Sequence, residues 1–222
     1  DISAVEHLPL AGRIADEDIT LVETALHGNE SLLTVDLSEN RELPDGLLLE
    51  SLNPNTLVFT TAGRKVATGN NVVVDGVCEE FILSDNHPFG TDRAFTATHA
   101  AYSRTLAPNA NETLYIPFKA ESVDGLFYSV INRIDEQGTV NVSVTEQDAH
   151  VPVMMHATPG SAVANGGTVT FNASNVEITP ETEPASEFTT TLTGSYRFTS
   201  PTEARFGYSD GTFNKAVRLE PF

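Results

Sequence analysis

The sequence predicts a mainly β protein with a small α/β part: a short leucine-rich-repeat unit packed on an antiparallel β-sandwich or barrel. Two observations predict it. The first 75 residues contain 13 leucines and one aromatic residue, Phe59, whereas residues 76–222 contain the other 16 phenylalanines and tyrosines. Short β-branched and aromatic runs separated by turn residues fill this second region. We therefore predict two domains, a leucine-rich-repeat-like unit at 1–75 and an antiparallel β-rich domain at 76–222.

A recurring apolar register predicts the repeat unit. The segment Leu32–Asn40 has the repeat spacing, in which alternate apolar side chains of a short strand point inward and an asparagine bonds the backbone of adjacent coils. The register recurs at Leu8–Leu10 and at Leu57–Phe59, which are offset by 27 and 22 residues from Val35–Leu37. Both offsets lie within the repeat period of roughly 20–29 residues. We expect three adjacent parallel strands; a single αβ unit that mimics the spacing is the alternative.

One helix is predicted between the first two strands, at Asp16–Leu26. Ile19, Val22 and Leu26 lie on one helical face, acidic residues occupy the first turn, and Gly28 follows the end. This helix belongs on the side of the repeat opposite the strands. Because so few coils leave open apolar faces, we expect the second region to cap them.

The second region predicts β-strands throughout, separated by Asp-Gly, Gly-Gly and Asn-Pro turns. Two hairpins are the clearest, one joining the runs 127–134 and 139–144 and one at Tyr208–Phe213. The predicted strands are Val72–Val74, Phe81–Leu83, Ala94–Arg104, Leu114–Phe118, Phe127–Ile134, Val140–Val144, Val151–His156, Val169–Phe171, Val176–Ile178, Phe188–Phe198, Ala204–Tyr208 and Thr212–Arg218.

Several segments spread over the chain also carry a family resemblance: Leu32–Asn40, Leu52–Phe59, Asn71–Cys78, Leu83–Phe89, Ala94–Arg104 and Thr113–Phe118. With them the chain resembles exported leucine-rich-repeat, adhesin-like surface proteins of Gram-negative gut bacteria, in which repeats precede a β-rich C-terminal domain. The resemblance implies a surface-exposed, non-catalytic protein. It carries no catalytic or ligand-binding residues across.

Charge and composition exclude some classes of function. With 12 lysines and arginines against 31 aspartates and glutamates, the formal charge is −19, which excludes a protein that neutralises nucleic-acid phosphates. No stretch approaches the roughly 18 apolar residues of a membrane span, so we expect no direct membrane insertion. The acidic, lysine-poor composition favours an extracellular, cell-surface or periplasmic location, as a mature chain without its signal peptide.

The single cysteine, Cys78, rules out an intramolecular disulfide and a thiolate metal cluster made by this chain alone. It lies in the apolar run Val72–Leu83, which has no histidine or basic residue to lower the pKa of the thiol. We therefore predict a buried, unreactive thiol rather than a nucleophile.

Motifs for nucleophiles, cofactors and metals are absent, and no two histidines are spaced i,i+2 or i,i+4. Asp85, Asn86 and Asp92 could offer oxygens to calcium, but they are also standard turn formers, so we expect a turn in which metal is optional. The acidic runs Asp16–Asp18 and Glu181–Glu183 are predicted to be a helix N-terminus and a solvated loop. The sequence predicts no catalytic, cofactor-binding or metal-binding residue and no cofactor, and it does not define the partner-binding surface. The six histidines, predicted to be isolated, are His7, His27, His87, His99, His150 and His156.

The leading hypothesis is a non-catalytic exported surface protein with an adhesion or interaction role, whose partner is an extracellular or host protein or a glycan. The alternative is a carbohydrate-binding module or a glycan hydrolase that uses loop carboxylates. Hydrolysis needs two carboxylates at a defined separation, and no spacing selects a pair among the 31. Because the chain has no tryptophan, most aromatic rings are expected in a β core.

Overall fold

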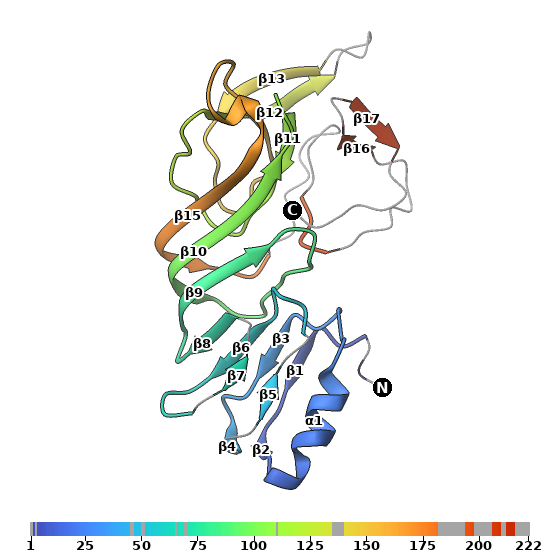
Figure 1. Cartoon of the computed structure of the whole chain (residues 1–222), viewed down its shortest axis with the longest axis vertical. Coiled ribbons are helices and arrows are strands. Elements are labelled where there is room, and N and C mark those ends of the chain that lie inside the picture. The colour runs from blue at the N-terminus through green and yellow to red at the C-terminus, as the bar shows by residue number, and fades with distance from the viewer. Residues whose placement is uncertain are drawn as a thin grey trace. The chain divides into compact units, whose positions relative to one another are not determined.

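The computed structural model describes residues 2, 4–44, 47–49, 52–64, 66–68, 71–109, 111–134, 140–181, 194–197, 206–209 and 212–215. The chain forms two compact units, which are described separately: unit 1 comprises Asp1–Ala101 with Ser174–Pro180, and unit 2 comprises Tyr102–Ala173 with Glu181–Phe222. As predicted, the protein is mainly β, and its two larger described sheets are a mixed sheet and an antiparallel sheet (Figure 1).

Unit 1 begins with a row of adjacent parallel strands, which Figure 1 shows side by side. Leu8 pairs with Val35, Val35 with Val58, and Val58 with Val72. This confirms the expectation that the three predicted segments form adjacent parallel strands. The strands of this row are β1 (His7–Pro9), β3 (Thr34–Asp36), β6 (Leu57–Thr60) and β8 (Asn71–Val74).

The register at β6 differs by one residue from the predicted one, because Val58 rather than Leu57 aligns with Val35. Successive side chains of a strand point to opposite faces, so the shift puts Leu57 and Phe59 on the other face from Val58. All three side chains are buried. The run has no apolar–polar alternation, and its pattern therefore could not indicate which residue faces the core.

Four very short strands, which the sequence did not indicate, accompany this row. They pair in parallel as β2 (Gly12–Arg13) with β4 (Asn40–Glu42), and β5 (Leu48–Leu49) with β7 (Ala67–Thr68). Strands of two or three residues by themselves carry too little periodicity to be predicted from sequence.

The predicted helix forms as a 3₁₀ turn, η1 (Asp16–Asp18), followed by α1 (Ile19–Leu26). Leu26 is buried, Val22 packs against the core, and Gly28 has φ +70° just beyond the helix end. The predicted helical face is thus confirmed at Val22 and Leu26, and Ile19 at its start is partly buried. The core of this part of unit 1 contains Ile14, Leu26, Leu32, Val35, Leu37, Leu47, Leu49, Leu52 and Val58.

The change in composition near residue 75 coincides with a change in strand pairing. At Asp75–Gly76 the chain turns with φ of 47° and 83°, and β9 (Val77–Ser84) returns antiparallel to β8. The sheet continues into β10 (Phe95–Leu106) and ends with β15 (Gly167–Ile178), so its order is β1-β3-β6-β8-β9-β10-β15. The two predicted strands at 169–171 and 176–178 are parts of the single strand β15.

Unit 2 contains an antiparallel sheet with the order β11-β14-β12-β13, and a 3₁₀ turn η2 (Val163–Asn165). Both predicted hairpins are confirmed: β12 pairs with β13, and β16 (Phe206–Ser209) pairs with β17 (Thr212–Lys215). The four sheet strands are β11 (Asn111–Leu114), β14 (Val153–Ala157), β12 (Leu126–Ile134) and β13 (Val140–Thr145).

The predicted strand Leu114–Phe118 was wrong. Strand β11 ends at Leu114, and the residues that follow are buried without strand pairing. Pro117 has no N–H to donate to a ladder, and continuous burial produces the same apolar run as a strand. The predicted strand Phe188–Phe198 lies largely outside the described residues.

Candidate functional site

One face of the parallel row in unit 1 is closed by aromatic side chains. The Phe81 ring lies 5.4 Å from Phe89 and 5.3 Å from Phe95 between ring centroids, and Phe95 lies 6.3 Å from Phe59. All four side chains are buried. The β6 face that carries Phe59 is therefore core rather than a ligand-binding surface.

Two buried asparagines hold the covering loop in place. Asn53 donates to the carbonyl of Pro88 at 2.6 Å. Asn55 donates to the carbonyls of Ser84 and His87 at 3.0 and 2.8 Å, and its oxygen accepts the Ser84 N–H at 2.7 Å. These bonds satisfy loop backbone groups that the strands leave unpaired. Residues of the second sequence region thus cover the first, as the capping prediction required.

An arginine adds an electrostatic contact to the same loop. Arg93 donates to Asp36 at 2.6 Å and to Asp92 at 3.1 Å, and its guanidinium lies 4.6 Å from the Phe59 ring centroid. Burial disfavours the ionised form of Asp36, but hydrogen bonds from Ser38 and Arg93 outweigh it and lower the pKa of that carboxyl. Asp92, a candidate calcium ligand by sequence, is thus engaged with a cation.

The other two candidate calcium ligands make a local turn, as expected. The Asn86 N–H donates to the Asp85 carboxylate at 3.1 Å, and Asn86 has φ 60°. Among the residues that the structure describes, no three His, Cys, Asp or Glu side chains are grouped so that they could hold a metal ion.

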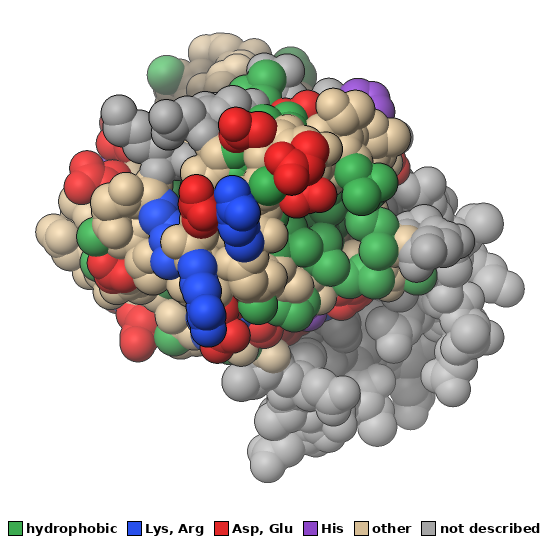
Figure 2. Space-filling view, turned by 90° about the horizontal axis from the view of Figure 1, so that it is seen from below, with side chains coloured by type: hydrophobic (Ala, Val, Ile, Leu, Met, Phe, Trp, Pro, Cys, Tyr) green, Lys and Arg blue, Asp and Glu red, His purple; other side chains and the backbone are tan. Residues whose placement is uncertain are grey.

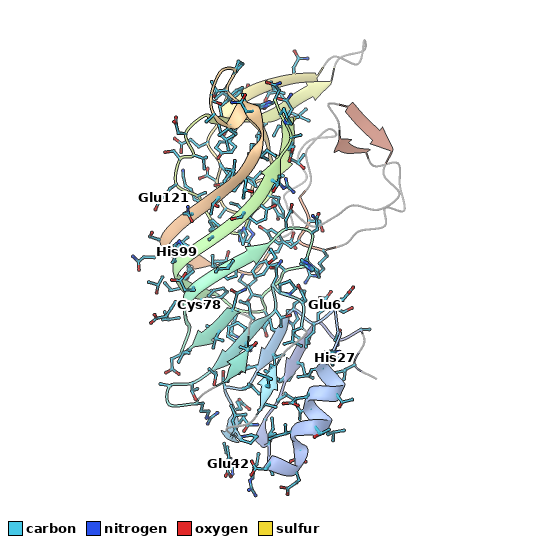
Figure 3. The ribbon with its side chains drawn as sticks, viewed as in Figure 1. Glu6, His27, Glu42, Cys78, His99 and Glu121 are labelled. Atoms are coloured by element: carbon cyan, nitrogen blue, oxygen red, sulfur yellow. The ribbon has the colours of Figure 1, made fainter. Side chains whose placement is uncertain are left out.

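Cys78 is buried within β9, as predicted (Figure 3). Burial raises the pKa of its thiol to about 11. A thiol with this pKa is a poor nucleophile at neutral pH. The Cys78 sulfur lies 3.4 Å from the carbonyl oxygen of Glu80.

The histidines occur singly in the structure, and most contact polar side chains of other residue types. His7 bonds the Thr34 hydroxyl at 2.9 Å, and His150 bonds the Tyr196 hydroxyl at 3.1 Å. His27 follows α1, and the His87 side chain is exposed. His156 has the most informative surroundings.

The two acidic runs have different outcomes. The first is the predicted helix N-terminus, where Asp18 accepts the Ala15 N–H at 3.0 Å. In the second, Glu181 is half-buried rather than solvated, because it accepts hydrogen bonds from the Tyr115 hydroxyl at 3.1 Å and from Arg197 at 3.4 Å. The rest of that run, 182–183, lies outside the described residues.

The Tyr115 ring that contacts Glu181 belongs to a buried aromatic pair in unit 2. It stacks on Tyr196 with 4.3 Å between centroids, and burial raises the pKa of both phenols. A Cβ at Gly194 would overlap the Tyr115 ring. The pair therefore fixes the segment 194–197 in unit 2.

The antiparallel sheet brings three polar side chains from different strands into one hydrogen-bonded chain. The Ser129 Oγ lies 2.6 Å from His156 Nε2, and His156 Nδ1 lies 2.7 Å from Asn111 Oδ1. An amide oxygen can only accept, so Nδ1 carries the proton and Nε2 accepts the serine proton. Burial lowers the pKa of His156, which favours this neutral form. The Phe127 ring stacks on the imidazole with 4.7 Å between centroids.

This order of groups is that of a nucleophile, a base and an orienting residue. The burial of Ser129 argues against nucleophilic catalysis, because the residue is only 1 % exposed and a substrate could not reach its hydroxyl. A reacting carbonyl must come to about 3 Å from the nucleophile. The chain of bonds instead ties β11, β14 and β12 together across the sheet.

The same sheet face presents apolar side chains to solvent. Ser129 pairs with Val144 and Ile131 with Val142, so alternation places both valines on the face that carries Phe127 and His156. Phe127, Val142 and Val144, 38, 48 and 75 % exposed, are here called the outer patch. Sequence reasoning assigned these residues to strands, but it could not indicate which strand faces remain uncovered.

Charged side chains on the described surface are mostly acidic, and several are paired. Arg13 and Glu42 form an exposed ion pair at 2.9 Å in unit 1. Figure 2, which views the molecule from below, shows a few basic side chains next to acidic ones, with hydrophobic side chains gathered beside them. Exposed pairs of this kind contribute little to stability.

No protein-family model, curated protein or solved structure matches the chain. None of the described helices has the length and apolar character needed to cross a membrane. The candidate site therefore rests on the chemistry of the outer patch and of the hydrogen-bonded chain beside it.

Proposed function

We propose that this protein is a non-catalytic interaction protein that binds a protein partner through the outer patch of β12 and β13. The observation that carries the proposal is the exposure of Phe127, Val142 and Val144 on one sheet face. On a chain with a formal charge of −19, a neutral apolar surface on ordered strands is the feature that a partner could bury.

Burial of the outer patch would supply part of the binding free energy. Complete burial of a valine or phenylalanine side chain contributes about 1.5–3 kcal/mol, and the three residues of the patch are already partly buried. Their contribution to binding is therefore a few kcal/mol at most. Such a patch would serve as the centre of an interface, with polar contacts around it.

The finer architecture and setting belong to the same proposal. The parallel row with α1 would be a short leucine-rich-repeat unit in an exported, adhesin-like protein located at the cell surface, in the periplasm or outside the cell. The aligned row Leu8–Val35–Val58 supports it. The buried Asn40 does not add to this support, because its oxygen accepts the N–H of Glu42 in its own coil at 3.1 Å and its Nδ2 has no hydrogen-bond partner. The acidic composition and the single, buried cysteine are compatible with that setting.

The experiment compares two charge substitutions at exposed valines. Val144→Glu places a charge in the outer patch, and Val74→Glu places the same charge on β8, where Val74 is also exposed. Each variant of the 222-residue chain would be tested against arrays of extracellular proteins and of glycans. The expected result is a protein ligand whose affinity falls at least tenfold for Val144→Glu and is unchanged for Val74→Glu.

A hydrolytic function is tested as the alternative, because Ser129, His156 and Asn111 are hydrogen-bonded in the order that a serine nucleophile requires, although the 1 % exposure of Ser129 argues against it. Hydrolysis of p-nitrophenyl acetate that Ser129→Ala abolishes would replace the interaction proposal with this one. Glycan binding that is insensitive to Val144→Glu would favour the carbohydrate-binding alternative. Equal losses of protein binding in both valine variants would refute the patch as the binding surface.

A further inference from the structure

Strand β13 forms one edge of the four-stranded sheet (Figure 1). It pairs with β12, and no other described strand pairs with its outer side. We propose that this edge accepts an extended segment of a basic partner protein as an additional strand. The inference deepens the proposed function, on which it rests, by naming the partner's chemistry.

The backbone of β13 is suited to strand addition. An edge strand presents N–H and C=O groups that can pair with another chain, and proteins commonly block such edges with charged residues or proline. The segment 140–145 contains only valine, asparagine, serine and threonine. The irregularity in its pairing lies between Ile131 and Arg133 of β12, so Val142–Thr145 pairs regularly. A regular, uncharged edge offers continuous main-chain hydrogen bonds to a peptide.

The side chains of β13 indicate the pattern of the added strand. Val142 and Val144 belong to the outer patch, whereas Ser143 points to the opposite face and accepts a hydrogen bond from Asn132 at 2.5 Å. Cross-strand neighbours on one face lie about 4.5–5.5 Å apart, so they contact directly. The added strand should therefore alternate aliphatic residues, placed against the valines, with small polar residues.

Charge selects a basic partner. Glu146 follows β13 directly and Asp148 lies close by, and both share one cation, Lys119, at 2.7 and 2.9 Å. Two carboxylates against one ammonium leave a negative charge at this end of the strand. A second copy of this chain would bring the same charges and be repelled, whereas lysines or arginines flanking the added strand would be attracted.

The test uses a fluorescent peptide in which valine and threonine alternate over five residues between two pairs of lysines. Titration with the full chain, followed by fluorescence anisotropy, should give saturable binding that weakens between about 50 and about 300 mM salt, because added salt shortens the Debye length. Two control peptides, one with proline at the central valine and one with glutamates in place of the lysines, should bind at least tenfold more weakly. Equal binding of the proline peptide would overturn the proposal, because strand pairing would then be dispensable.

Amide hydrogen exchange locates the peptide on the chain without any substitution. In an antiparallel strand, alternate residues direct their N–H groups to one neighbour and the rest point away. The bound peptide should slow exchange at alternate amides within 142–145 by at least tenfold. Protection elsewhere, without protection in β13, would refute the edge. A dimer of the protein, dissociated by the peptide, would identify a second copy as the occupant and overturn the choice of a basic partner.

The two proposals fail in different ways. If the peptide does not bind but the affinity for a protein ligand still falls in Val144→Glu, the outer patch is supported as the binding surface and the strand addition is refuted. If no ligand responds to Val144→Glu, the proposed function itself is refuted.

Discussion

Replacement of Phe81 by alanine should strongly destabilise unit 1. This side chain is fully buried and contacts the rings of Phe89 and Phe95 at 5.4 and 5.3 Å between centroids. Removal of a buried phenylalanine costs about 3–5 kcal/mol, which includes the cavity that remains. Phe81→Leu keeps much of the volume but loses two aromatic contacts of about 0.5–1.5 kcal/mol each, so it should cost about 1–3 kcal/mol.

The single thiol provides the assay. Cys78 lies buried in the same strand as Phe81, so a thiol reagent can modify it only when this part of the sheet opens. When reclosing is fast, the modification rate is proportional to the population of the open state. A loss of 3–5 kcal/mol would then raise the rate about 150-fold to several thousand-fold, since about 1.4 kcal/mol corresponds to a factor of ten.

The neighbouring Ile82 supplies the control, because it lies on the other face of β9 and is 52 % exposed. Ile82→Ala should raise the modification rate of Cys78 less than about tenfold, since little apolar surface is lost. An increase below fivefold for Phe81→Ala, or equal increases for both variants, would refute the conclusion that the aromatic cluster of Phe59, Phe81, Phe89 and Phe95 stabilises this part of unit 1.

Four further outcomes are expected. Burial lowers the pKa of His156, so the unfolded chain binds more protons than the folded chain between the folded-state pKa and about 6.5. The free energy of unfolding should therefore fall as the pH drops through that range. His156→Gln should reduce the slope of unfolding free energy against pH by up to about 1.4 kcal/mol per pH unit. Asn55→Ala should cost about 2–4 kcal/mol in urea denaturation, because it leaves buried loop backbone groups without partners. The fragment 1–75 should show no cooperative thermal transition, since it lacks three rings of the aromatic cluster. A chelator should leave the melting temperature within about one degree, because local hydrogen bonds already order Asp85 and Asp92, and a larger drop reversed by calcium would contradict this.

Local periodicity and turn chemistry account for the parts of the fold that could be predicted. Leu8 and Val35 each precede a leucine by two residues, so their parallel alignment could be predicted. The helical face of Val22 and Leu26 follows the 3.6-residue period. Leu57 and Val58 are both buried, so the apolar pattern could not show which of them aligns with Val35.

Long-range pairing explains what the sequence could not show. Strand β14 lies between β11 and β12 although it follows both in the chain, and this insertion brings His156 beside Asn111 and Ser129. No short motif encodes contacts between residues 27 and 45 positions apart. Glu181 looked like a solvated loop residue because its partner, Tyr115, lies 66 positions away.

Because of the turn at Asp75–Gly76, the number of strands in the parallel row does not depend on the structure that ends the row. Leu8, Val35 and Val58 follow one another at intervals of 27 and 23 residues, and only beyond β8 does the chain reverse. An extra segment of about that size, inserted ahead of β6, would add one strand and extend the row by about 4.8 Å while leaving the aromatic cluster and β9 as they are. The fold could therefore be extended, by evolution or by design, without rebuilding its terminus.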